Sequence, residues 1–305
     1  IIQENKILFL ISSGISNDLS IQNGKVILYD LDTDFEQSNV NLTINSKNKH
    51  VVNYLKKSPI NVKNYKKLEN IEGNTKIKLE LDFPLIIDLP TEKITYGSEV
   101  NIKNAIFKGI FKDYNIDDFI VDISIDSEGV SYSGSGALIN SIVTFEGKQF
   151  SENNKLIDTV SGIYNLNSKY LETILPKNSL EYTGDININF EIKEDDDGIA
   201  KIEGIGNLDK IALNSPFLGS NLDFKNGKLR FLVRPYDDSF SGFVDVKTNN
   251  IQIEINSLFN DDKLLELDVQ TFKSPIQDFK MNYKDSDKKV SIFGKELIVS
   301  EVNFL

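Results

Sequence analysis

Residues 76–83 read KIKLELDF, so that every second side chain is apolar and those between are charged. Successive side chains of a β-strand point to opposite faces of the sheet. The stretch therefore predicts a strand with one apolar face and one solvated face. The apolar members are Ile77, Leu79, Leu81 and Phe83.

The same period of two recurs along the chain, while helical periodicity is weak. We therefore expect an all-β protein of about twenty strands, with an antiparallel sheet whose apolar face is covered and whose polar face is wet. Periodicity alone does not distinguish a closed sandwich from an open, curled sheet, because each needs one apolar face per strand. The apolar members of the other runs are Phe119, Val121, Ile123, Ile125, Ile186, Ile188, Phe190, Ile192, Ile251, Ile253 and Ile255.

Two segments have the pattern of short helices, and turn dipeptides separate the strand-like runs. The helical segments are Lys49 to Lys57, and Ser168 to Leu175, which Pro176 ends. Asn23-Gly24 and Asn226-Gly227 are predicted as hairpin turns, since both residue types tolerate a positive φ.

Composition excludes several classes of function. The 305 residues carry a net charge of −12, which argues against nucleic acid as the main partner. The chain has no cysteine, which excludes disulfides and thiolate chemistry, and one histidine, which excludes a histidine-rich metal site. No run of eighteen apolar residues exists to span a bilayer as a helix.

No motif for catalysis or cofactor binding emerges. Asp30, Asp32 and Asp34 have the opening spacing of a calcium loop, but the glycine and glutamate that such a loop needs are replaced by Phe35 and Asn41. The glycine pairs at 134 and 136 and at 204 and 206 lack a third glycine, and they indicate glycines at strand ends or bulges. The single histidine, at position 50, has no local partner to orient it. We expect no enzyme activity, no cofactor and no metal.

A series of landmarks follows in order along the chain. The landmarks are Leu55–Ile60, Ile71-Glu72-Gly73, Phe83-Pro84-Leu85, Gly129–Gly136, Ala137-Leu138, Val143-Thr144-Phe145, Phe150, Ser161-Gly162, Leu171–Pro176, Gly184, Leu208, Pro216-Phe217-Leu218 and Gly227. Over roughly residues 13 to 235 this order resembles the AsmA-like envelope proteins, in particular the YhdP-type branch in its alphaproteobacterial form, with TamB-like relatives. The chain lacks the tryptophans expected in relatives near Phe145 and after Gly219.

This resemblance implies a long, curled, taco-like β-sheet whose open apolar groove carries phospholipid or another acyl-chain lipid. Such proteins bridge the inner and outer membranes, so the expected place is the periplasm. An inner-membrane anchor is expected in an N-terminal part that this sequence lacks, with other envelope proteins as further partners. The alternating apolar residues are the candidate groove residues.

The same resemblance implies an organisation in groove units joined into one continuous elongated structure. Residues 1–70 would end a preceding unit, 71–150 would form a second, and 151–305 a third. The expected boundaries between units lie in the polar stretch Ser151–Lys155 and near Asn70–Asn74.

Two other functions fit the same strands. A structural or adhesive β-sandwich array would close the apolar faces against each other. A carbohydrate-active β-solenoid enzyme would place Asp, Lys and Arg together on neighbouring strands, with Arg230 or Arg234 among them.

Overall fold

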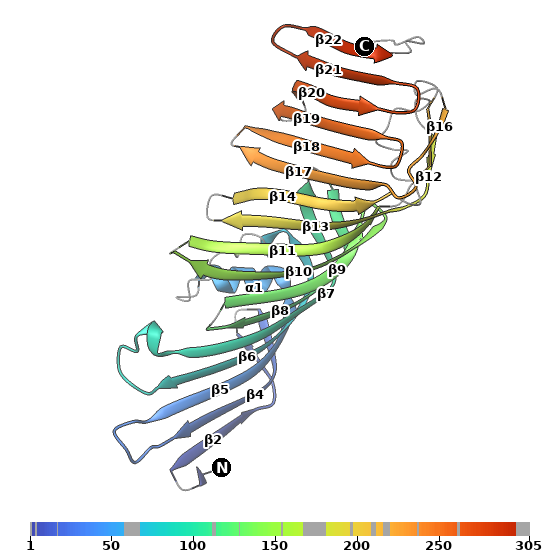
Figure 1. Ribbon diagram of the computed structural model, residues 1–305. Coiled ribbons are helices and arrows are strands. Elements are labelled where there is room, and N and C mark those ends of the chain that lie inside the picture. Colours follow the sequence, from blue (N-terminus) through green and yellow to red (C-terminus); the bar gives the residue numbers. More distant parts are fainter. Residues whose placement is uncertain are drawn as a thin grey trace. The chain divides into compact units, whose positions relative to one another are not determined.

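The computed structural model is all-β, as the alternating pattern predicts, and its strands pair antiparallel in a sheet that is not closed (Figure 1). Among the described residues no helix is both long and apolar enough to cross a bilayer. The residues described are 2–3, 5–16, 18–57, 68–111, 114–127, 129–153, 155–166, 181–195, 198–208, 212–215, 220–236, 238–260 and 263–296.

The chain divides into two compact units, here called unit 1 and unit 2. Unit 1 contains residues 1–139 and 144–151, and unit 2 contains residues 140–143 and 152–305. The division falls within strand β10 (Ser141–Glu152).

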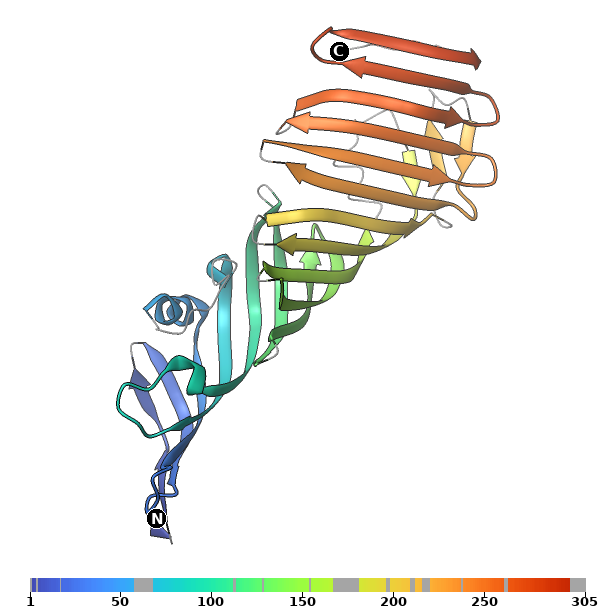
Figure 2. The ribbon, with the colours of Figure 1, turned by 60° about the vertical axis from the view of Figure 1, so that its left-hand side comes forward.

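Unit 1 is an antiparallel ladder in which β2, β4, β5, β6, β7, β8 and β9 pair in that order. The helix α1 confirms the prediction for residues 49–57, and it packs against β5 and β6 (Figure 2). The elements are β1 (Ile2–Gln3), β2 (Lys6–Ile11), β3 (Gly14–Ser16), β4 (Leu19–Tyr29), β5 (Gln37–Lys47), α1 (Asn48–Lys57), β6 (Ile71–Pro84), the 3-10 helix η1 (Thr91–Lys93), β7 (Thr95–Phe111), β8 (Tyr114–Asp126) and β9 (Gly129–Leu138).

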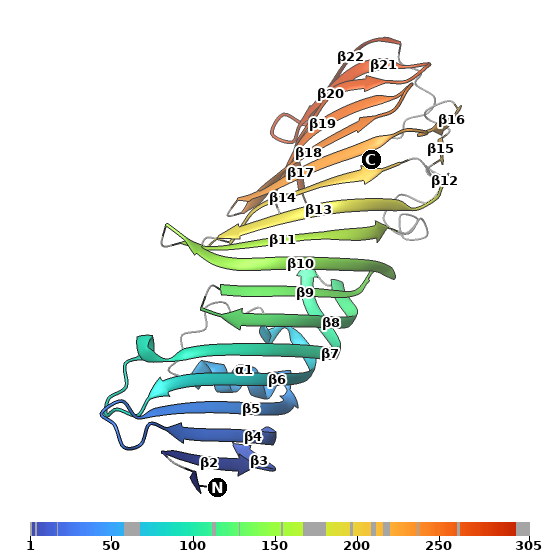
Figure 3. The same ribbon diagram turned by 60° about the horizontal axis from the view of Figure 1, so that its bottom comes forward.

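Unit 2 is a second ladder, in which β11, β13, β14 and β17 to β22 pair in that order. A small separate sheet of β12, β15 and β16 lies beside the ends of these strands (Figure 3). The strands are β11 (Lys155–Leu166), β12 (Glu181–Thr183), β13 (Ile186–Asp195), β14 (Gly198–Asn207), β15 (Ala212–Ser215), β16 (Ser220–Asp223), β17 (Lys228–Tyr236), β18 (Ser239–Lys247), β19 (Gln252–Asn260), β20 (Lys263–Lys273), β21 (Asp278–Lys284) and β22 (Lys289–Glu296).

The turn predictions have different outcomes. Asn226 has a positive φ of 58°, and the amide of Gly227 donates to the carbonyl of Phe224 at 2.6 Å, so that pair forms a turn. The turn is not the predicted hairpin, because β16 and β17 on either side of it belong to different sheets. The hairpin predicted at Asn23-Gly24 is wrong, because both residues lie inside β4 next to a bulge. A Cβ on Gly24 would lie 2.6 Å from a methyl carbon of Leu42, so close packing on β5 requires the glycine there. The helix predicted at 168–175 lies outside the described residues.

Candidate functional site

The apolar side chains of unit 1 lie on one face of its sheet. Residues directly opposite each other on antiparallel strands point to the same face, so the register connects them into rows across the strands. One row crosses β4 to β9 and consists of Ile21, Ile44, Ile77, Val100, Ile123 and Tyr132. The next row consists of Gly24, Leu42, Leu79, Ser98, Ile125 and Val130.

The remaining candidates of unit 1 lie on the same face. Leu81 is opposite Val40 and Tyr96, and Phe83 is opposite Ser38. Val121 is opposite Ile102 and Gly134, and Phe119 is opposite Ala105. The register therefore brings together all eight residues that the alternation selected in this unit.

Unit 2 has three corresponding rows on one face, each crossing β13, β14 and β17 to β22. The first consists of Ile188, Gly206, Leu229, Val246, Ile253, Phe272, Phe279 and Gly294. The second consists of Phe190, Gly204, Phe231, Val244, Ile255, Val269, Met281 and Ile292. The third consists of Ile192, Ile202, Val233, Gly242, Ser257, Leu267, Tyr283 and Val290. At ~4.8 Å between strands, eight strands make each row about 34 Å long. We call the rows of both units the apolar rows.

Burial along the apolar rows is incomplete. Leu79, Leu81 and Ile123 in unit 1 are half-buried, and so are Phe190 and Ile255 in unit 2. The inner face of a closed sandwich buries such side chains almost fully, because a second sheet packs on them. The open sheet therefore leaves much of its apolar face accessible, and the closed sandwich predicted by the adhesive alternative is not the observed arrangement.

Full burial occurs in two clusters and at single positions of the apolar face, among them Phe119, Val121 and Val269, which are 3 to 5% exposed. In unit 2, Ile186 and Ile251 form a core cluster with Leu208 and Phe224, and the four are between 3 and 8% exposed. In unit 1, α1 covers the rows at β5 and β6, where Val51 packs with Leu19 and Ile44. Leu55 of α1, together with Ile77, packs around this cluster. The helix therefore occupies part of the apolar face.

Glycines in the rows are covered by aromatic rings from a neighbouring strand. A Cβ on Gly134 would lie 2.6 Å from the ring of Phe145, and one on Gly204 would overlap the ring of Phe231. Phe145 stacks in turn on Phe119, with ring centroids 5.7 Å apart and an interplanar angle of 11°. The prediction of strand-end or bulge glycines is wrong for Gly134 and Gly204, which lie inside β9 and β14, where their backbones support rings that extend the apolar surface.

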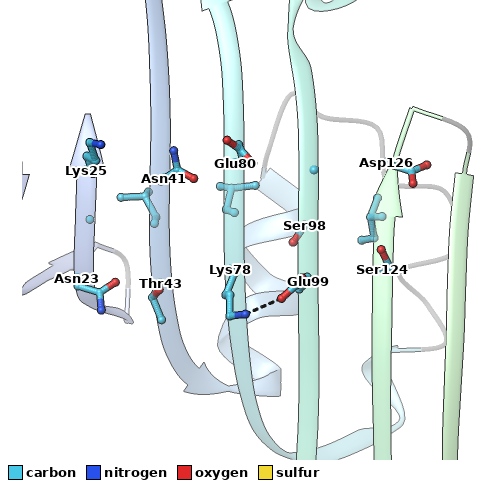
Figure 4. Close-up of a pocket in the computed structure, with 15 residues that line it drawn as sticks. Asn23, Lys25, Asn41, Thr43, Lys78, Glu80, Ser98, Glu99, Ser124 and Asp126 are labelled. Carbon is cyan, nitrogen blue, oxygen red and sulfur yellow. Dashed lines mark hydrogen bonds and ion pairs between the residues drawn. The ribbon is translucent and has the colours of Figure 1, made fainter. Parts of the chain in front are cut away.

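The opposite face of unit 1 is mainly polar. Lys78 of β6 forms an ion pair with Glu99 of β7 at 2.7 Å, and the side-chain amide of Asn39 donates to Asp82 at 2.8 Å. A hollow of about 590 Å³ lies over β4 to β8, with α1 behind the sheet (Figure 4). Its lining includes Lys25, Glu80 and Asp126, together with the apolar Leu42, Leu79 and Ile125.

The residues that sequence analysis set aside have ordinary structural places. Asp30 begins the turn between β4 and β5, where its carbonyl accepts a hydrogen bond from the hydroxyl of Thr33 at 2.8 Å. His50 lies on α1, with its Nδ1 3.7 Å from a carboxylate oxygen of Asp18. Arg230 lies opposite Asp245 on the face away from the apolar rows. Lys247 forms an ion pair with the same Asp245 at 3.1 Å, so this carboxylate already has a cationic neighbour.

Sequence analysis missed the contribution of the glycines and of α1 to the apolar face. Gly134 and Phe145 are eleven residues apart, and nothing in a period of two connects them. The apolar stripe of α1, with Val51, Val52 and Leu55, is visible in the sequence, but its destination on the sheet is not.

Comparisons of the chain with protein-family models, with curated proteins and with solved structures find no match.

Proposed function

We propose that this chain is a non-enzymatic section of a lipid-carrying bridge, in which acyl chains lie on the apolar rows. The observation that carries the proposal is the continuity of these rows over a sheet face that is only half-buried. Apolar patches of this extent are rare on soluble proteins and usually mark an interaction site. Each acyl CH₂ that leaves water contributes ~0.8 kcal/mol, so lipid binding here needs no specific polar contact.

The resemblance to AsmA-like proteins supports phospholipid as the cargo and the periplasm, between inner and outer membranes, as the place. The rows support movement as well as binding. Because leucine, isoleucine, valine and phenylalanine repeat from strand to strand, neighbouring positions offer similar contacts to a methylene chain. A tail then moves from one position to the next without breaking hydrogen bonds.

The test is lipid binding by the purified chain and two variants that differ only in the face they change. Ile188 lies in an apolar row of unit 2, and the adjacent Asn189 is exposed on the opposite face. Native mass spectrometry with lipid extraction measures the bound phospholipid. We expect the chain to carry lipid and Ile188→Glu to weaken binding at unit 2 more than tenfold, because the carboxylate would be buried without a partner.

Asn189→Glu introduces the same charge one residue away and is expected to bind lipid as the unchanged chain does. Circular dichroism shows whether each variant keeps its strands. Absence of lipid from the unchanged chain, or equal binding by the two folded variants, would contradict the proposal.

A further inference from the structure

The charge of this acidic chain is unevenly distributed, and its most basic segment contains α1. Residues 47–67 carry seven lysines and no aspartate or glutamate, in a chain whose net charge is −12. Uneven charge of this kind sets where an anion is attracted on a protein surface.

The described part of this segment places cations on the apolar side of the sheet. The stripe of α1 with Val51, Val52 and Leu55 faces the sheet, where Val51 and Val52 are buried and Leu55 packs on the core. Lys49 and Lys56 are seven residues apart and therefore lie on one side of the helix, the exposed side. Figure 2 shows α1 against β5 and β6. Because Val51 and Leu55 pack on the apolar face, Lys49 and Lys56 lie on the same side of the sheet as the apolar rows.

The other end of the same strands has the opposite charge. The turn between β4 and β5, residues 30–36, carries four carboxylates and no lysine or arginine. The eleven residues of β5 separate this turn from α1, a distance of about 36 Å at ~3.3 Å per residue. A negatively charged group is therefore attracted to the α1 end of unit 1 and repelled from the other end.

We infer that α1 binds the headgroup of the carried lipid, and that this lipid is an anionic phospholipid. The inference rests on the proposed function, because the apolar rows must hold the tails. Lys49 supplies an exposed ammonium for the phosphate, and Lys56, which forms an ion pair with Glu69 at 2.9 Å, lies two turns further along the helix. The tails extend from α1 over the adjacent rows at Val100 and Ile123.

The experiment is a competition between phosphatidylglycerol and phosphatidylcholine with matched acyl chains. The full 305-residue chain is incubated with vesicles that contain equal amounts of both lipids, and native mass spectrometry gives the ratio bound. The variant Lys49→Gln/Lys56→Gln removes two charges with a good helix-forming residue. The matched control, Lys25→Gln/Lys280→Gln, removes two exposed charges on the face opposite the apolar rows.

We expect the unchanged chain and the control to favour phosphatidylglycerol, and the α1 variant to lose about three- to tenfold of that preference, as expected for two exposed ion pairs. Total lipid bound should stay the same in all three. An equal ratio for the α1 variant and the control would overturn the headgroup assignment and leave the proposed function intact. Absence of both lipids from the unchanged chain would overturn the proposed function, and this inference with it.

Discussion

Each unit has one apolar face, and the two units differ in the composition of the opposite face. In unit 1 the opposite face is mainly polar, as in Thr43, Lys78 and Glu99, with a few exposed apolar residues such as Leu10 and Ile120. In unit 2 the opposite face also carries large apolar residues, among them Leu232, opposite Phe243, and the half-exposed Ile205. The feature that recurs in both units is the set of apolar rows, which is therefore the better guide to function.

The units also differ in how the rows end. In unit 1 the helix α1 follows β5 in the chain and packs on the apolar face. In unit 2 the buried cluster with Ile251 includes Leu208, which precedes β15, and Phe224, which follows β16. Both devices bury residues near the ends of the strands, whereas most members of the apolar rows are half-buried.

The largest expected effect comes from placing a charge in the rows of each unit separately. Ile123→Glu in unit 1 and Ile188→Glu in unit 2 should each remove part of the bound lipid, and the double variant should remove nearly all, because both units offer the same kind of surface. The control for unit 1 is Ser131→Glu, on the exposed opposite face of β9. Complete loss from either single variant would show that only one unit binds lipid.

The glycines in the rows give the next comparison. Gly134→Ala and Gly204→Ala both force an aromatic ring away, and overpacking of this kind costs about 1–3 kcal/mol of unfolding free energy. Gly134→Ala should cost more, since its Cβ would also overlap the carbonyl oxygen of Ile120, and backbone yields less than a ring. Urea unfolding measures both. A larger loss for Gly204→Ala would contradict this packing.

The attachment of α1 provides a prediction for unit 1 alone. Asn48 is 1% exposed, and its side-chain amide donates to the carbonyls of Leu68 at 2.7 Å and Ile71 at 2.9 Å. Asn48→Ala leaves these buried acceptors without that donor and should cost about 1–3 kcal/mol. Asn53→Ala, at an exposed position of α1, should change stability little. Equal unfolding curves for the two variants would refute the anchoring role.

The smallest expected effect is electrostatic and lies in unit 2. Asp285 accepts hydrogen bonds from Lys263 and Lys288, each at 2.5 Å, and these contacts lower the pKa of its carboxyl below the ordinary value of 3.8. A lowered folded pKa stabilises the protein above the unfolded pKa, and this contribution is lost as the pH falls through the folded value.

Asp285→Asn should therefore lower the melting temperature slightly at pH 7, with a difference that shrinks below about pH 4. High salt should reduce the difference further, because exposed ion pairs are screened. Asp287→Asn, in the same turn, is the control. A constant difference from pH 7 to pH 3 would mean that the ion pairs of Asp285 do not stabilise the turn.

Much of the fold was predictable from local pattern. The alternation at Ile77 to Phe83 and at Ile186 to Ile192 assigned strands and faces correctly, because the two-residue period of a strand is a local property. The alternation predicted burial less well at β19, where the polar residues Gln252, Glu254 and Asn256 are half-buried and not exposed. Asn23-Gly24 misled because its local turn preference was overridden by packing between β4 and β5.

The sequence by itself determined the all-β class, the apolar members of each strand, the helix near residue 50 and the uneven charge. Only the tertiary structure decided that the apolar residues meet in continuous rows, that the face remains open, and that α1 lies on it. The physical reason is that register and layer packing depend on contacts between residues far apart in the chain. Ile44, Ile77, Val100 and Ile123 share one row although many residues separate them, and no local periodicity specifies which neighbour each will meet.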